Sequence, residues 1–171
     1  SSITGNGVSL YNMEVDMWND NTELNVDGTV TVTNDLTLTD GNLNQGTAGV
    51  LNVEGDITLS STFGAEGSYM NDLEITVTGD VPQALSATTV GGWFHGLIVN
   101  KTDVLTVTGD SNSNNEIQFS GYNQDSLKIV SAANTVDFTT NETTVVLGGY
   151  HHNLTGNSFS LYNLESDLFA G

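Results

Sequence analysis

Apolar and polar residues alternate along most of the chain, with the two-residue period of a strand that buries one face. In "LNVDGTVTVT", Leu24, Val26, Val30 and Val32 fall on one side, and Asn and Thr residues fall on the other. The same alternation appears in "LNVEGDITLS", "LEITVTGD" and "VLTVTGD". Gly, Asn and Asp punctuate these segments, and such residues accept turn conformations at low cost. No segment has the spacing of an amphipathic helix, so the pattern predicts an all-β protein.

The strands recur at spacings that favour a coil of stacked turns. "LNVDGTVTVT" and "LNVEGDITLS" are 27 residues apart, and "ITVTGD" and "LTVTGD" are 30 apart. We place the starts of successive turns at Ile3, Leu24, Leu51, Leu73, Leu97, Leu127 and Leu154, about 25 residues apart. Repeats of roughly 20–50 residues are typical of solenoids, in which Leu stacks on Leu, Val on Val and Asn on Asn.

These spacings predict a parallel β-helix, or β-solenoid, of about six to seven turns that forms a single domain over residues 1–171. The alternative is a β-sandwich, which also contains about seven short strands. A sandwich has no need for regular spacing between the strands.

The chain begins and ends with nearly the same sequence. "ITGNGVSLYNMEVDMW" covers residues 3–18 and "LTGNSFSLYNLESDLF" covers residues 154–169, 151 positions later. We call these two stretches the terminal repeats. They are identical at nine of sixteen positions, namely Thr4/Thr155, Gly5/Gly156, Asn6/Asn157, Ser9/Ser160, Leu10/Leu161, Tyr11/Tyr162, Asn12/Asn163, Glu14/Glu165 and Asp16/Asp167. They predict two near-identical terminal turns.

Composition narrows the range of partners. Lys101 and Lys128 are the only strong cations against 21 acidic residues, which gives a net charge of −19. This balance argues against nucleic acid and anionic lipid, because both need clustered Lys or Arg. Cysteine is absent, and no apolar run approaches the ~18 residues of a membrane span. We therefore expect neither nucleic-acid binding nor membrane insertion.

Three longer stretches resemble the repeats of large bacterial surface proteins: "SLYNMEV", "GWFHGLIVNKTDVLTVTGD" and "DGTVTVTNDLTLTDGNL". The resemblance covers most of the chain. It implies a right-handed parallel β-helix in an extracellular or cell-surface adhesin, stalk or fibre. It implies no catalytic residues.

The matching ends favour self-assembly, because a solenoid exposes unpaired strand edges and apolar core at both ends. We expect an extracellular filament in which the C-terminal turn of one molecule stacks on the N-terminal turn of the next. The expected interface residues are Leu10, Tyr11, Met13, Val15, Phe159, Leu161, Tyr162 and Leu164. A head-to-tail contact of this kind does not close on itself and builds a fibre.

The alternative function is a glycan-binding adhesin repeat, excised from a longer tandem-repeat surface protein. Trp18, Trp93 and Tyr122 would then offer aromatic faces to sugars. In a thin solenoid core, however, we expect these aromatic residues to fill the interior.

Candidate chemistry is sparse. His151 and His152 lack a third ligand at metal-binding spacing, and His95 lies far away in the sequence. The carboxylates considered for acid–base catalysis are Glu14, Asp16, Asp56, Glu74 and Glu116. A glycosidase needs two carboxylates at a defined separation, and an enzyme for acidic sugars would lack an arginine clamp here. We therefore expect no enzyme and no cofactor.

Two weaker signals concern calcium and glycans. The segments "WNDNTE", "TNDLTLTDGN" and "GDSNSNNE" are rich in the oxygen ligands that Ca²⁺ prefers, although turn chemistry alone explains them. Asn100, Asn141 and Asn153 begin the triplet of N-glycosylation and are candidate glycosylation sites.

Overall fold

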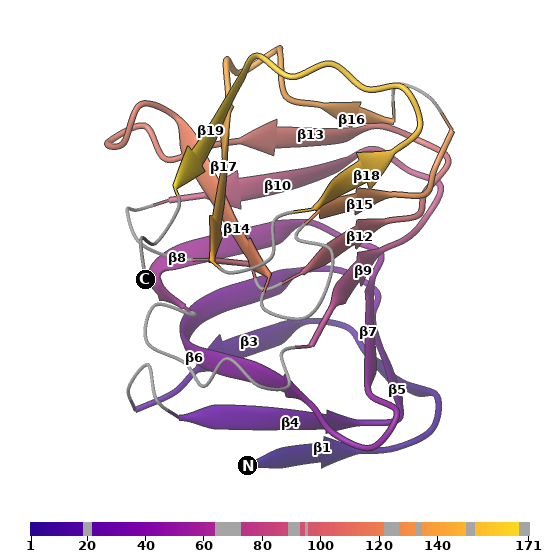
Figure 1. Cartoon of the computed structure of the whole chain (residues 1–171). Helices are drawn as coiled ribbons and strands as arrows, with labels where there is room; N and C mark the ends of the chain where they lie inside the picture. Colours follow the sequence, from indigo (N-terminus) through magenta and orange to yellow (C-terminus); the bar gives the residue numbers. More distant parts are fainter. Residues whose placement is uncertain are drawn as a thin grey trace.

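The protein is a parallel β-solenoid of about six turns. The computed structural model describes residues 1–18, 22–63, 73–88, 93–94, 96–121, 127–132, 135–149 and 153–167. Over these residues every regular element is a strand, and every pair of neighbouring strands is parallel. The turns rise from β1 at the N-terminal end to β16, β18 and β19 at the C-terminal end (Figure 1). The predicted solenoid is confirmed, and the sandwich alternative is wrong.

The coil has three faces, and the described strands follow one another through them in a constant order. Face I is a seven-stranded sheet made of β2 (Val8–Leu10), β5 (Thr29–Val32), β7 (Val50–Val53), β9 (Ile75–Val77), β12 (Leu97–Val99), β15 (Leu127–Ile129) and β18 (Leu154–Gly156). Face II contains β3 (Met13–Asp16), the first half of β6 (Leu36–Gln45), β8 (Ile57–Phe63), β10 (Gln83–Ala87), β13 (Leu105–Thr108) and β16 (Val136–Asp137).

Face III is divided into two parts along the axis. Its N-terminal part contains β1 (Ser2–Thr4), β4 (Glu23–Asp27) and the second half of β6. Its C-terminal part is a four-stranded sheet of β11 (Trp93–Phe94), β14 (Glu116–Gly121), β17 (Thr144–Gly149) and β19 (Asn163–Asp167). In both parts of face III, a face III strand is followed along the chain by a face I strand, as β1 is by β2 and β17 by β18. The two parts therefore occupy the same position within the turn.

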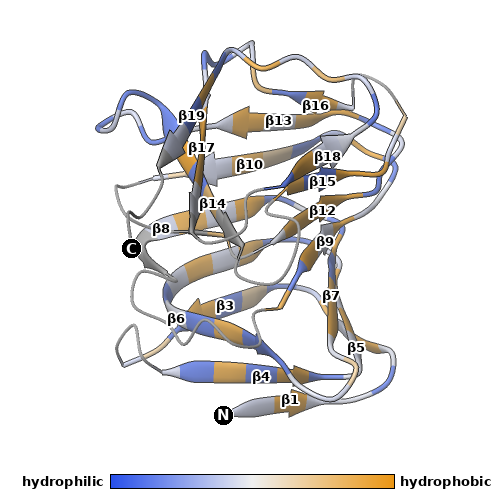
Figure 2. Ribbon diagram, in the orientation of Figure 1, coloured by the Kyte–Doolittle hydropathy of each residue, from blue (hydrophilic) through white to orange (hydrophobic). Residues whose placement is uncertain are grey.

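Alternation along each strand separates core from surface. In β10 and β13 the odd-numbered residues are buried and the even-numbered ones are partly exposed. Figure 2 shows apolar and polar bands alternating along the strands. Within face I, Leu97, Leu127 and Leu154 stack in register, as expected of like on like. On face III the rings of Phe94 and Phe119 stack with centroids 5.6 Å apart. Phenylalanine and aliphatic residues therefore fill the coil.

The corner that follows face I repeats one hydrogen bond at six successive levels. The last carbonyl of each face I strand accepts a bond from the backbone N–H just after the equivalent strand in the next turn. The accepting carbonyls belong to Leu10, Val32, Val53, Val77, Val99 and Ile129. We call this series the corner ladder. It spaces the turns evenly along one edge of the coil.

Asparagine also stacks at this corner. The side-chain amide of Asn34 donates to Oδ1 of Asn12 at 2.8 Å, and this oxygen also accepts from the Asp35 backbone at 3.2 Å. The expected sharing of amide hydrogen bonds between equivalent corners is confirmed here.

The predicted turn starts are only partly right. Leu97, Leu127 and Leu154 stack as expected, but Ile3 and Leu24 lie on face III whereas Leu51 lies on face I. Leu51 pairs with Val30, not with Leu24. The similar sequences that start at Leu24 and Leu51, 27 residues apart, therefore do not stack on each other. All three faces use the same alternation of apolar and polar residues, so similar strands on different faces were aligned with each other.

Replacing Phe119 with Ala tests the core. The side chain is fully buried and stacks on Phe94, so its loss leaves a cavity that the rigid coil cannot fill. We expect a loss of about 3–5 kcal/mol in the free energy of unfolding, measured by urea denaturation. The outward-facing Thr76→Ala on β9 should change this free energy by less than about 0.5 kcal/mol. Equal losses in the two variants would contradict the assignment of Phe119 to the core.

Candidate functional site

The two ends of the coil present unpaired strand edges. At the N-terminal end, β1, β2 and β3 each have a strand neighbour on one side only, namely β4, β5 and β6. At the C-terminal end, β18 pairs with β15 alone and β19 with β17 alone among the strands that the structure describes. Within the described ranges no helix or strand covers either edge. Backbone groups at both ends can therefore pair with a further strand.

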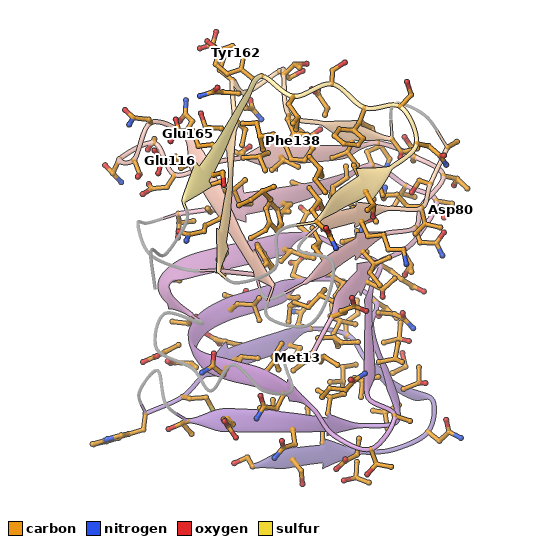
Figure 3. The ribbon with its side chains drawn as sticks, viewed as in Figure 1. Met13, Asp80, Glu116, Phe138, Tyr162 and Glu165 are labelled. Atoms are coloured by element: carbon orange, nitrogen blue, oxygen red, sulfur yellow. The ribbon has the colours of Figure 1, made fainter. Side chains whose placement is uncertain are left out.

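Apolar side chains accompany these open edges. Ile3, Val8 and Leu10 at one end, and Leu154, Phe159 and Leu161 at the other, contact the core but are only partly buried. Tyr11 is 72% exposed and Leu164 is 47% exposed. Tyr162 points away from the body at the C-terminal end (Figure 3). The end surfaces thus combine backbone edges with accessible apolar area.

Two of the eight predicted interface residues contribute little to these surfaces. Met13 and Val15 are already buried in the coil, and Figure 3 shows Met13 inside it. They cannot gain much further burial by contact with another molecule. Leu10, Tyr11, Phe159, Leu161, Tyr162 and Leu164 retain accessible surface.

The terminal repeats occupy successive faces, not the same face. Thr4 lies in β1 on face III, whereas its counterpart Thr155 lies in β18 on face I. Ser9 lies on face I, but Ser160 forms a bridge to Asp137 of β16 on face II. The third strands follow the same rule, with β3 on face II and β19 on face III. The 151-residue spacing therefore corresponds to a whole number of turns plus one face.

A groove of about 770 Å³ runs along the corner ladder. We call it the corner groove. It is lined by residues that follow the face I strands of several turns: Thr33, Glu54, Gly79, Asp80, Val81, Asn100, Lys101, Thr102, Val130, Ser131 and Ala132. Figure 3 shows Asp80 at the outer margin of this side of the coil. The groove was not predicted from the sequence, because its residues come together only when the turns are stacked.

Lys101 lies beneath the groove as a buried cation, with 4% of its surface exposed. Its Nζ donates to the carbonyls of Val81, Asp103 and Val104 at 2.8, 3.2 and 3.1 Å. Burial lowers the pKa of the ammonium from 10.5, and the carboxylates of Asp103 and Asp80 oppose this shift. The three carbonyls use all three donors of the ammonium. Lys101 therefore joins the loop between β12 and β13 to the loop before β10.

Replacing Lys101 with Met should destabilise the coil by about 1–3 kcal/mol, because the partly buried hydrogen bonds from its ammonium to the carbonyls of Val81 and Asp103 are lost. The carbonyl of Val104 keeps the backbone N–H of Gln83. Lys128→Met is a matched control, since it makes the same charge change at an exposed position of β15. It should cost less than about 0.5 kcal/mol by urea denaturation. Similar losses would mean that net charge, not the buried contacts, explains the effect.

Asp110 is a buried carboxylate at the start of the loop "DSNSNNE". Its Oδ1 accepts bonds from the backbone and side chain of Asn112, and Oδ2 is buried with no hydrogen-bond partner in the described part of the chain. Glu116 accepts from the hydroxyl of Ser113 at the other end of this loop. In the described ranges no group of three or more His, Asp or Glu side chains is placed to hold a metal ion. Calcium binding by this loop stays a prediction.

Asp137 shows how turn geometry stabilises a carboxylate. The side chain and backbone of Thr140 donate to it, as do those of Thr139, and these bonds lower the pKa of the Asp137 carboxyl to about 2. Because the pKa in the folded state lies below its ordinary value of 3.8, the stabilisation is present above that value. It is lost as the pH falls from about 4 to about 2.

Replacing Asp137 with Asn tests this stabilisation. At pH 7 we expect a loss of at most about 1 kcal/mol, since solvent screens this accessible turn. The difference from the unmodified protein should shrink as the pH falls from about 4 towards 2, as followed by urea denaturation across this range. The exposed Asp35→Asn provides the comparison. A difference that stays constant down to pH 2 would exclude the charged turn as its cause.

The structure places the carboxylates that were considered for catalysis on several segments, and only Glu14 and Asp16 share a strand. Glu14 and Asp16 are exposed on face II, and Asp56 accepts a bond from the backbone of Ala84 before β8. Glu74 precedes β9, and Glu116 begins β14 on face III (Figure 3). His95, His151 and His152 lie outside the described residues.

The expectation that Trp18 fills the core is wrong. Its side chain is 93% exposed just after β3, because Met13, Val15 and Met17 alternate towards the interior and leave the even-numbered positions outside. The side chain of Trp93 and the whole of Tyr122 lie outside the described residues.

The three glycosylation triplets differ in accessibility. Asn100 is exposed on the wall of the corner groove, and Asn153 is exposed before β18. Asn141 donates its amide to the hydroxyl of Thr108, and Thr143, the third residue of its triplet, is fully buried. Asn141 is therefore a poor acceptor in the folded protein.

Comparisons with protein-family models, with curated protein sequences and with solved structures found no match to this chain. In the described ranges the chain forms no helix with the length and hydropathy of a membrane span.

Proposed function

We propose that the protein is a structural subunit of an extracellular filament or surface fibre, in which solenoids stack end to end. The observation that supports this proposal is the pair of open ends, each with unpaired parallel strands and partly exposed core residues. The resemblance to bacterial surface repeats favours the same role and location. In this proposal the protein acts mechanically and catalyses no reaction.

Strand pairing and apolar burial together would hold such a junction. Full burial of one large apolar side chain contributes about 1.5–3 kcal/mol, and association costs roughly 4–15 kcal/mol in lost freedom. The partly buried Ile3, Val8 and Leu10 would meet the C-terminal Leu154, Phe159 and Leu161 of another copy. Several such contacts, combined with parallel pairing on three faces, are sufficient to offset that cost. The contact joins different surfaces of the two copies, so it continues into a fibre.

A tandem arrangement within one longer polypeptide would use the same ends. In such an array, residues 154–167 would form the first three strands of a second copy of the sequence. The β4, β5 and β6 of that second copy would then pair with them, as these strands pair with β1, β2 and β3 in this structure. This version gives the same mechanical role to a covalent array.

The glycan-binding alternative has one specific observation in its favour, the exposed indole of Trp18. Aromatic rings can stack on the apolar faces of sugars. Of the three aromatic residues named for this role, Trp18 is the one whose side chain the structure describes, and it offers less surface than the broad ends do, so the filament is our first proposal.

Placing charge on the C-terminal end should stop elongation. In Leu161→Asp with Leu164→Asp, two carboxylates replace apolar surface at the end, and we expect folded particles that do not form fibres. The matched control is Thr31→Asp with Thr76→Asp, which makes the same charge change on the outer side of face I. Light scattering and electron microscopy should show fibres for the control only. Fibres of normal length from the end variant would contradict end-to-end stacking.

Assembly should strengthen with salt, because each subunit carries a net charge of −19. The screening length falls from about 30 Å at 0.01 M salt to about 8 Å at 0.15 M. Light scattering across this range should show longer assemblies at higher NaCl concentration. A protein that stays monomeric at high concentration, in salt and in calcium, would refute the filament.

A further inference from the structure

The order in which the strands rise restricts how two copies can stack. In the first turn β1 lies lowest, then β2, then β3, on faces III, I and II. In the last turn β18 lies lowest, then residues 159–161, then β19, on faces I, II and III. Each strand of the upper copy must lie one strand spacing above the strand that it covers. The two open ends are therefore steps of a spiral and not flat surfaces.

A three-sided coil allows three alignments, and they pair different numbers of open strands. With the faces in line, β1 covers β19, and a gap one strand wide remains both below β2 and below β3. With β1 over residues 159–161, β2 covers β19, and such a gap remains below β3. With β1 over β18, β2 covers residues 159–161 and β3 covers β19. Among the strands that the structure describes, this last alignment alone pairs all three edges without a gap.

We propose that copies of this chain join in this last alignment, which we call the rotated junction; the inference rests on the proposed filament function. Face III of one copy lies over face I of the copy below, so each copy is turned by one face about the axis. The fibre then repeats after three copies. With seven strands on face I and ~4.8 Å between strands, each copy adds about 35 Å to the length of the fibre.

The backbone groups of β18 that face the open side lie at a defined position. In a parallel ladder, alternate residues direct both N–H and C=O towards one neighbouring strand, and the residues between them towards the other. Leu127 donates to the carbonyl of Asn153 in the turn above, so Asn153 and Thr155 direct their groups towards β15. Leu154 lies between them and therefore directs its N–H and C=O towards the open side.

The first strand of the upper copy offers the complementary groups. Gly5 donates to the carbonyl of Asp27 in β4, so Thr4, the residue before it, directs its groups downwards. Placing Ile3 over Leu154 then brings the N–H of Thr4 to the carbonyl of Leu154. Ile3 and Leu154 both pack against the core of their own coil, so the same register also continues the interior from one copy into the next.

The terminal repeats also give the two end turns matching corners. Residues 5–7 connect β1 to β2, and their counterparts 156–158 precede residues 159–161. In the interior, by contrast, one residue separates β4 from β5 and four separate β6 from β7. In the rotated junction Val8 and Leu10 therefore lie over Phe159 and Leu161, and all four side chains are partly buried against the core. Corners and strands of one end fit those of the other.

One pair of carboxylates meets across the rotated junction. In the register of the terminal repeats Glu14 lies over Glu165, and both side chains are exposed. Like charges directly opposite each other destabilise a strand pair. The coil contains one such contact at a register shift, where Asp16 stands opposite Asp40. The junction is therefore sensitive to charge at this contact, and salt favours its formation.

Cysteine pairs distinguish the three alignments, because the chain contains no cysteine of its own. Thr4→Cys is combined in turn with Thr155→Cys for the rotated junction, with Ser160→Cys for β1 over residues 159–161, and with Glu165→Cys for faces in line. All four native side chains are exposed. Opposite residues of neighbouring strands lie about 4.8 Å apart, within reach of a disulfide. Each variant is assembled in NaCl, imaged, oxidised with diamide and separated on a denaturing gel without reductant.

We expect filaments from all three variants, and a ladder of covalent multimers from Thr4→Cys/Thr155→Cys alone. The single variants set the background, since each can form dimers at most. A ladder from either of the other pairs, or filaments without a ladder from any pair, overturns the rotated junction and leaves the filament intact. Absence of filaments from the unmodified protein, in salt and in calcium, refutes the proposed function itself.

Electron microscopy of filaments of the unmodified protein tests the alignment without any substitution. Image reconstruction should show copies that follow one another at about 35 Å along the axis, each turned by one face, with face III over face I. Copies with their faces in line, or with face III over face II, would overturn the rotated junction even if the cysteine variants failed to assemble.

Removing the carboxylate pair provides a further test of the register. Glu165→Gln should lower the concentration at which filaments appear at low salt about two- to fivefold, as followed by light scattering. Glu54→Gln is the matched control, since it makes the same charge change at an exposed position after β7, in the middle of face I. It should have a smaller effect. Equal effects from the two variants would exclude the contact between Glu14 and Glu165 and overturn the rotated junction in this register.

Discussion

Parallel, in-register pairing between successive turns is the constraint on which the rest of this structure depends. Every face I strand places its residues directly over those of the turn below, as Leu97, Leu127 and Leu154 do. Each residue must therefore fit the residues directly above and below it in the neighbouring turns, as well as the interior of the coil. Aliphatic columns inside and Thr or Asn columns outside both follow from this. The corner ladder extends the same regularity into the loops after face I.

Charge is subject to the same constraint. Where the described strands pair, most acidic residues stand opposite a neutral residue such as Thr, Asn or Gly, and Asp16 opposite Asp40 is an exception at a register shift. Positive charge plays almost no part in balancing the carboxylates, since one of the two lysines is enclosed by backbone carbonyls. Lys101 acts as a hydrogen-bonding strut between loops more than as a counter-ion. The acidic outer surface is thereby left to solvent and salt.

Alternation and spacing in the sequence were sufficient to predict the all-β class and the solenoid. They were not sufficient to predict which strands stack, because Leu24 and Leu51 begin nearly the same sequence on different faces. The position of Trp18 was also mispredicted, since the prediction followed its hydrophobicity and not the alternation that turns Met13, Val15 and Met17 inward. The corner groove and the burial of Lys101 depend on several turns meeting at one corner. One signal was available: most face I strands are followed by a short run of polar and small residues, as in "VNKT" and "VTGD".

The orientation of the strands also decides how such a fibre would respond to tension. Strands run across the axis, so the hydrogen bonds between turns lie along it, and a pull on the ends loads them one turn at a time. Within one chain, each turn that detaches increases the extended length of the chain, for instance by the 22 residues from Val8 to Val30 or the 30 from Leu97 to Leu127. The covalent chain would therefore lengthen in steps and absorb work before breaking. A junction between separate copies holds no such reserve of chain, so a fibre of stacked subunits would part at its junctions and could rejoin there.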